Sequence, residues 1–287
     1  MENQLRQAMP HCVYMVTQVL GMWKSIMYEG RLIMGMEVKR NTFATDAIND
    51  LEIRVAVASV EVRSSEDALI RVEAENLQDM DYTCEVRNQK LVVIYGLEGR
   101  KHLVNFNLKE AEIILYLPQG KTFEHIELEI GAGSINMKDV PVLCKDMEAE
   151  IGAGKWRVAY LKVSERLDLQ IGAGEVKMKS ATVGTLNLEC GVGSYMYKGC
   201  VTKDIKVDCG VGNCKFELEN KESDFNYDVF CALGNVKINK SSIRCMGSKK
   251  IYSDRKAKGT ATLKCGLGNI ELDTNEKEEK GKVALEK

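Results

Sequence analysis

Four cysteines that recur at one position of a repeated segment are the residues with the clearest capacity for chemistry. They are Cys190, Cys209, Cys231 and Cys265. Thiols bind zinc or form disulfides, but zinc needs a tetrahedral set of ligands. Strands stack about 4.8 Å apart, which is farther than the ~3.5–4.5 Å between the Cβ atoms of a disulfide. The sequence also has no Cys-x-x-Cys motif, so we expect a buried column of free thiols with no metal and no cofactor.

Charged residues stand on both sides of a short glycine-rich run in these segments. If that run is a corner, the residues before it form an acidic strip on one face and those after it a basic strip on another. A solvated surface is the simplest interpretation, because exposed charges interact weakly in water. The alternative is a strip that binds a cation, a polyanion or a partner protein. The acidic strip consists of Glu129, Glu150, Glu189 and Asp208, and the basic strip of Arg157, Lys177, Lys215 and Lys237.

A carbohydrate-acting enzyme is a weaker alternative, because paired carboxylates at suitable separations hydrolyse glycosidic bonds. A regular column of one residue type is more typical of a surface than of a catalytic site, and no environment that would shift a pKa is evident. We therefore expect no enzymatic activity and assign no catalytic residues. The Gly-x-Gly motifs do not predict phosphate binding, since a dinucleotide fingerprint has a third glycine that opens a helix.

The elements that position these residues are seven copies of one short unit between residues 128 and 273. Their third residues lie at 130, 151, 171, 190, 209, 231 and 265, so most steps are about 20 residues and the last is 34. The inward parity of the apolar residues changes across the glycine-rich run, which requires a bend because strand side chains alternate. Glycine permits positive φ and tight turns. We therefore assign the corners to Gly131, Gly133, Gly152, Gly154, Gly172, Gly174, Gly191, Gly193, Gly210, Gly212, Gly234, Gly266 and Gly268.

Stacking of such units predicts an all-β fold: a right-handed parallel β-helix (β-solenoid) with a strand-rich N-terminal cap. We interpret the last step as one coil plus a polar loop around residues 241–259, and residues 51–62 as a degenerate eighth copy with two inserted residues. Where the third residue of a unit is Ile the fifth is Ala, and where the third is Cys the fifth is Val or Leu. This pattern predicts a volume-conserving exchange inside the core.

At its Ile-Gly-x-Gly units, and at the Gly-Leu-Gly-Asn-Ile-Glu-Leu run at 266–272, the sequence resembles a bacterial family known as "putative adhesin". The resemblance covers roughly residues 48–273. It implies a right-handed parallel β-helix and a domain of unknown function, and it brings no catalytic or binding residues. The chain departs from the family pattern by having Cys in place of Ile in its later units.

The flanking segments, the net charge and the cysteine content further restrict what the chain can be. Residues 1–48 are expected to be a weakly helical segment or linker, 49–273 one β-solenoid domain, and 274–287 a charged, disordered tail. The net charge of −2 indicates no basic surface for nucleic acid, and no apolar run reaches the ~20 residues that span a membrane. Ten cysteines in a long chain without a recognisable export signal favour a reducing compartment and a cytoplasmic location. The alternative is a cell-surface location, reached by an export route that the sequence does not reveal.

The function expected from these features is that of a non-enzymatic structural or interaction module, adhesin-like in shape, which binds through its long flat faces. Its partner would be a protein or a cell-surface glycan. The first alternative is a self-associating intracellular scaffold whose coil ends stack head to tail, because open strand edges pair readily.

Overall fold

The computed structural model describes residues 26–28, 31–33, 38–77, 81–96, 110–244, 247–251 and 257–275. These residues form an all-β structure whose only helical elements are two short 3₁₀ turns, Thr45–Ala47 and Glu222–Asp224. No helix in the described ranges is long and apolar enough to cross a membrane. The first 25 residues of the expected N-terminal segment, and the expected tail from residue 276 on, lie outside these ranges.

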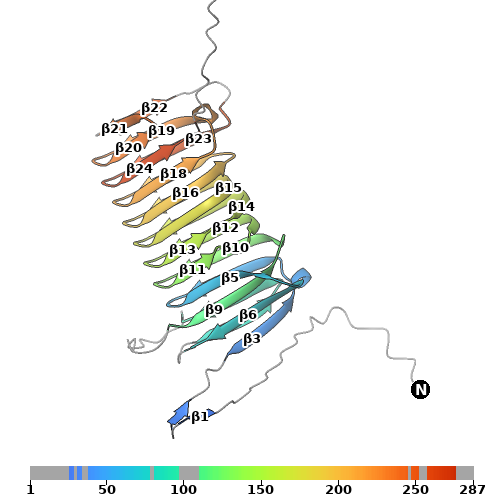
Figure 1. The fold of residues 1–287 in the computed structure, drawn as a ribbon. Helices are drawn as coiled ribbons and strands as arrows, with labels where there is room; N and C mark the ends of the chain where they lie inside the picture. The colour runs from blue at the N-terminus through green and yellow to red at the C-terminus, as the bar shows by residue number, and fades with distance from the viewer. Residues whose placement is uncertain are drawn as a thin grey trace, which may run out of the picture.

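Most coils consist of two strands joined at a corner, and neighbouring coils pair in parallel along one solenoid-like stack (Figure 1). The register is kept from coil to coil, so that Ile130 pairs with Ile151, Ile151 with Ile171, and Ile171 with Cys190. Inward and outward positions therefore form continuous columns along the stack. The strands of this central region are β10 (Thr122–Ile130), β11 (Ser134–Met137), β12 (Val142–Ile151), β13 (Lys155–Val158), β14 (Leu161–Ile171), β15 (Glu175–Cys190), β16 (Ser194–Val201), β17 (Ile205–Cys209) and β18 (Asn213–Leu218).

The C-terminal end is formed by β19 (Phe225–Cys231), β20 (Asn235–Ile238), β21 (Ser241–Arg244), β22 (Gly247–Ile251), β23 (Gly259–Cys265) and β24 (Asn269–Asp273). Here the last coil in the sequence is not the last coil in space. The β23–β24 coil lies between the β17–β18 coil and the β19–β20 coil, in parallel with both (Figure 1). The segment expected to be a loop instead forms β21 and β22, which pair antiparallel with β20 and β19. The interpretation as one further coil plus a loop is therefore wrong. Strands β19–β22 form the end of the stack, and the chain then runs back to place the β23–β24 coil between the β17–β18 and β19–β20 coils.

The N-terminal end is formed by β3 (Lys39–Ala44), β4 (Asp50–Val55), β5 (Ser59–Ser65), β6 (Leu69–Glu75), β7 (Tyr82–Arg87), β8 (Lys90–Tyr95) and β9 (Glu112–Pro118). The β4–β5 coil lies between the β10–β11 coil and the β8–β9 coil, again in parallel with both. Strands β6 and β7 pair antiparallel with β9 and β8, and β3 with β6. Two short strands, β1 (Ile26–Tyr28) and β2 (Arg31–Ile33), form a separate antiparallel pair.

Two expectations for this N-terminal end are wrong. Val55 pairs with Ile130 and Ser59 with Ser134, so residues 56–58 match residues 131–133 and the eighth copy has no inserted residues. The sheet also begins before residue 49, because β3 lies in the segment expected to be helical or a linker. Its pairing with β6 explains why, since the outermost strands of a stack need a partner for their backbone groups.

The second glycine of each corner is required by close contact between coils and not by an unusual backbone conformation. Among the described glycines only Gly96, Gly120 and Gly199 have positive φ, so the positive φ that we expected of the corner glycines is wrong. A Cβ atom on Gly133 would lie 2.1 Å from the carbonyl oxygen of Ala58, and one on Gly212 would lie 2.4 Å from that of Gly193. Each corner therefore rests almost directly on the backbone of the next.

The fifth residue of each unit points away from the core, which contradicts the expected exchange of volume. Ala132, Ala153 and Ala173 are exposed, and Val192 and Leu233 each retain 68% of their accessible surface. The bend between the corner glycines turns this side chain outward, so its size cannot compensate for the Cys or Ile at the third position. The third residues themselves are buried at Ile130, Ile151, Ile171, Cys190, Cys209, Cys231 and Cys265.

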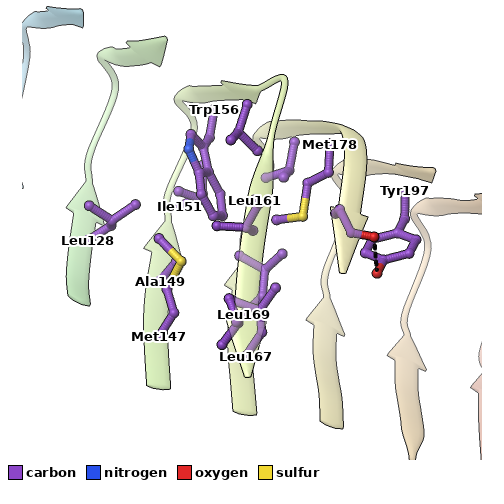
Figure 2. Close-up of a cluster of buried hydrophobic side chains, with 14 of the residues drawn as sticks. Leu128, Met147, Ala149, Ile151, Trp156, Leu161, Leu167, Leu169, Met178 and Tyr197 are labelled. Atoms are coloured by element: carbon purple, nitrogen blue, oxygen red, sulfur yellow. Dashed lines mark hydrogen bonds between the residues drawn. The ribbon is translucent and has the colours of Figure 1, made fainter. Parts of the chain in front are cut away.

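One continuous apolar core runs through the stack, from Phe43 in β3 to Leu272 in β24. Its largest side chain is Trp156, which is fully buried. Figure 2 shows Trp156 directed inward beside Ile151 and Leu161. Towards the later coils the core holds three neighbouring rings, because Phe216 contacts Tyr195 and Tyr197 at centroid distances of 5.4 and 6.3 Å.

Asn220 extends the stack beyond the end of β18 and gives a first prediction. Its side-chain amide accepts a hydrogen bond from the backbone N–H of Val201 at 2.9 Å and donates one to the Val201 carbonyl at 2.8 Å. Asn220→Ala leaves both backbone groups without these partners, and an unpaired buried group costs about 1–3 kcal/mol. We expect a loss of about 2 kcal/mol in the free energy of unfolding by urea, and almost none for the exposed neighbour variant Thr202→Ala. Equal stability of the two variants would contradict this role.

Candidate functional site

The most distinctive surface feature is a row of apolar side chains at the tips of neighbouring corners, which we call the corner ridge. It consists of Val192, Val211, Leu267 and Leu233 in spatial order, with 68, 52, 60 and 68% of their surface exposed. Backbone hydrogen bonds set this order: Val211 N–H donates to Gly191, Leu267 N–H to Gly210, and Leu233 N–H to Gly266, at 2.7–2.9 Å. The out-of-sequence coil is therefore what places Leu267 between Val211 and Leu233.

The corner ridge continues towards the N-terminal end with smaller side chains. The same position is occupied by Ala173, Ala153 and Ala132, and next to Ala132 by Val57, which is 38% exposed. Two further exposed apolar residues lie near the ridge: Phe230, before the corner that carries Leu233, and Met196, after the corner that carries Val192. Single exposed apolar residues are ordinary on protein surfaces, whereas contiguous ones mark contact sites.

The acidic strip lies along one side of these corners. Glu129 pairs in register with Glu150, and Glu189 with Asp208, with Gln170 between the two pairs. Arg54 lies 3.7 Å from Glu129, and the strip ends where Asp208 pairs with Lys264. Beside the strip, a hollow is lined by His125, Asp146, Met147, Glu148, Arg166 and Asp168. The carboxylates of the strip thus stand outside that hollow.

The basic strip lies on the other side of the corners, as expected, and acidic side chains stand among its members. Lys177 contacts Glu175 at 2.5 Å, Lys215 contacts Glu217 at 3.1 Å and Lys237 contacts Glu271 at 2.5 Å, while Arg157 also reaches Glu175 at 3.5 Å. The hydrogen bond from each lysine lowers the pKa of its carboxyl partner, so the pairs stay ionised at neutral pH. Because Arg157 and Lys177 share Glu175, three carboxylates stand against the four cations of the strip and reduce its positive charge without cancelling it. A binding role for this strip stays a prediction.

The thiols form a column, but their order and their number differ from what the repeat suggested. In space the column runs Cys190, Cys209, Cys265, Cys231, because of the inserted coil. A fifth buried thiol, Cys214 on β18, joins it: the Sγ atoms of Cys190, Cys209 and Cys214 all lie within 4.8 Å of one another. Our sequence reasoning missed Cys214, although it stands two residues after Gly212, where Ile135 and Trp156 occupy inward positions in their own coils.

Comparison with known proteins adds a family and a set of solved structures. The family model Toastrack DUF4097 matches residues 48–285, and no curated protein matches the sequence. A "putative cell adhesion protein" from Clostridium sporogenes is 14% identical, with 84% of this chain and 100% of that chain covered and a TM-score of 0.37. A "putative adhesin" from Bacteroides fragilis is 12% identical, with 83 and 97% covered and a TM-score of 0.44.

A third solved structure, a "putative lipid binding protein" from Parabacteroides distasonis, is 13% identical, with 83% of this chain and 96% of that chain covered and a TM-score of 0.36. At these identities and TM-scores the likenesses are too loose to locate a ligand or a binding residue on this chain. The surface features described above therefore have to be judged on their own chemistry.

Proposed function

Because the chain belongs to the Toastrack DUF4097 family, with the match beginning at residue 48 and ending at residue 285, we propose that it is a non-enzymatic interaction module that binds another protein through its corner ridge. The observation that supports this proposal is the exposure of Val192, Val211, Leu267 and Leu233 in one row. Complete burial of a Val or Leu side chain stabilises a complex by about 1.5–3 kcal/mol. Covering the exposed parts of the four residues therefore contributes roughly 4–7 kcal/mol before the costs of association.

The shape of the ridge favours a concave protein partner over a second copy of this chain. A single row of side chains presented against an identical row buries little surface on either side, whereas stable specific interfaces bury about 1,200–2,000 Å². A groove that encloses the row contacts it from both sides. The partner we propose thus presents an apolar groove at its contact surface.

The charges beside the ridge favour a protein over an anionic membrane. Glu189 on β15 and Asp208 on β17 stand just before the corners that carry Val192 and Val211, and both carboxylates are exposed. Carboxylates at this position repel acidic lipid headgroups and would attract basic side chains at the rim of a protein groove. We therefore expect the rim of the partner to carry Lys or Arg.

Head-to-tail stacking has less support, because both ends of the stack carry antiparallel strands, β3, β6 and β7 at one end and β21 and β22 at the other. The exposed Lys39 and Arg40 of β3 are the kind of edge residues that discourage strand pairing.

We further propose that the coils wind right-handed, as parallel crossover connections do. A cytoplasmic location fits the free cysteines of the described ranges, since disulfides are rare in reducing compartments.

The proposal predicts that polar substitution of the ridge removes the partner without harming the fold. We expect Leu233→Ser/Leu267→Ser to abolish a heteromeric complex that the wild-type protein forms in its native cells, measured by native electrophoresis and size-exclusion chromatography. The free energy of unfolding should change by less than about 1 kcal/mol, because these side chains lie outside the core.

Tyr160→Ser is the matched control, because Tyr160 is 55% exposed and lies away from the ridge. This variant should keep the complex. A complex that survives in the ridge variant, or a wild-type protein that runs only as a monomer or as a homo-oligomer, would refute the proposed function.

A further inference from the structure

The three thiols of Cys190, Cys209 and Cys214, here called the thiol triangle, form a ligand set that neither the repeat nor the proposed interaction explains. Cys190 and Cys209 are register partners on neighbouring coils. The corner at Gly210–Gly212 turns the chain so that Cys214 faces them from the adjoining strand. All three side chains are buried, with at most 3% of their surface exposed.

The triangle has three sulfur ligands and no fourth. Among the described residues, no further His, Cys, Asp or Glu joins this group. Zinc in structural sites takes four ligands in a tetrahedron, so the set is incomplete for zinc. Soft thiolate ligands favour thiophilic elements. Because the triangle offers three sulfur atoms, it suits an element whose coordination is complete with three sulfur ligands.

The apolar surroundings of the three thiols restrict the net charge of the complex that they can form with a bound element. The triangle lies in the apolar core beside Tyr195, which pairs in register with Cys214. The Sγ of Cys209 donates a hydrogen bond to the Gly212 carbonyl oxygen at 3.2 Å. No Lys, Arg or His contacts these thiols within the described part of the chain. A complex that leaves net charge in such a core is costly. Three thiolates around a monovalent or divalent cation leave a net negative charge, whereas three around a trivalent centre leave none.

We propose that the thiol triangle is a binding site for a trivalent, three-coordinate thiophilic element of the arsenite class. The exchange balances without a redox step: As(OH)₃ and three thiols give As(S-Cys)₃ and three molecules of water. Three As–O bonds and three S–H bonds break, three As–S bonds form, and each thiol proton leaves with a hydroxide as water. Arsenic stays in the +3 state and the product is neutral.

One structural feature bears on access to the buried thiols. Cys190 and Cys209 lie directly beneath corner glycines, since a Cβ atom on Gly212 would lie 2.7 Å from the Sγ of Cys190 and one on Gly268 would lie 2.9 Å from that of Cys209. Glycine has no side chain that would cover these two sulfur atoms at the corners.

The test uses the full, reduced chain and arsenite, added to the native protein and, separately, during refolding from urea. Intact mass spectrometry should show one arsenic per chain with the loss of three thiol hydrogens. After alkylation in denaturant, peptide mapping should find Cys190, Cys209 and Cys214 protected and the other cysteines modified. X-ray absorption should show three sulfur neighbours around arsenic.

Variants separate this site from general thiol reactivity. Cys214→Ser should lose the stoichiometric adduct, whereas Cys144→Ser, which removes a buried thiol outside the triangle, should keep it. Because the wild-type mapping needs no variant, a folding defect in Cys214→Ser leaves the test decisive. No adduct by either route, protection of a different set of cysteines, or tighter binding of Zn²⁺ than of arsenite would overturn the proposal.

Discussion

Replacing Gly212 with alanine is expected to lower the free energy of unfolding by about 3 kcal/mol or more. The added Cβ atom would lie 2.4 Å from the Gly193 carbonyl oxygen and 2.7 Å from the Sγ of Cys190. The first of these atoms belongs to the backbone of the next corner, which is held in the ladder of hydrogen bonds between coils. The strain therefore has no flexible side chain to absorb it. Urea unfolding followed by circular dichroism measures the loss.

Gly210→Ala is the matched control at the first position of the same corner. There the Cβ atom would lie 3.1 Å from the Gly191 oxygen, a contact that a small shift relieves. Alanine also reduces the entropy of the unfolded chain, which favours folding by about 0.4–1 kcal/mol. We expect a net change below about 1 kcal/mol, and the natural Ala232 at this position in another coil is consistent with that. Equal losses at the two positions would contradict the crowding explanation of the corners.

Truncating Trp156 to alanine is expected to cost about 3–5 kcal/mol, the range measured for large aromatic residues in protein cores. Trp156 is fully buried in β13 and lies between Ile135 and Val176 of the neighbouring coils. Its removal opens a cavity that straight, hydrogen-bonded strands cannot close. Because the indole N–H has no hydrogen-bond partner among the described residues, Trp156→Phe removes an unsatisfied donor.

We therefore expect Trp156→Phe to lose much less stability than Trp156→Ala, about 1 kcal/mol. Both variants are compared by urea unfolding with a circular dichroism readout, which does not depend on tryptophan emission. A phenylalanine variant as unstable as the alanine variant would mean that the indole N–H has a partner, and that volume alone does not determine the loss.

The sequence predicted the repeated strand unit, the corners and the buried third position, because alternation and glycine spacing act within one coil. It could not predict which coil follows which in space. The step of 34 residues before Cys265 is compatible both with a sequential coil and with a coil inserted between Cys209 and Cys231, since both arrangements bury the same residues. Pairing of β23 with β17 and β19 decides for insertion.

The candidate site was missed for a related reason. Val192, Val211, Leu233 and Leu267 are apolar, and apolar residues next to a strand are expected to point inward. A corner interrupts the alternation of inward and outward side chains along a strand. That alternation therefore cannot predict whether the single residue between two glycines points inward or outward. Only the backbone path shows that this residue points outward. For the basic strip, sequence spacing identified Lys215 and Lys237 but not the carboxylates of Glu217 and Glu271 that pair with them.

The measurement that tests the account most directly is photo-cross-linking from the corner ridge in the native cell. A photoreactive phenylalanine analogue replaces Val211, near the middle of the ridge, and in a control strain replaces Tyr160. The account predicts one discrete adduct with a different protein from position 211, lost when Leu233→Ser/Leu267→Ser is added, and no such adduct from position 160. An adduct with lipid or with a second copy of this chain, or the same adduct from both positions, would contradict it.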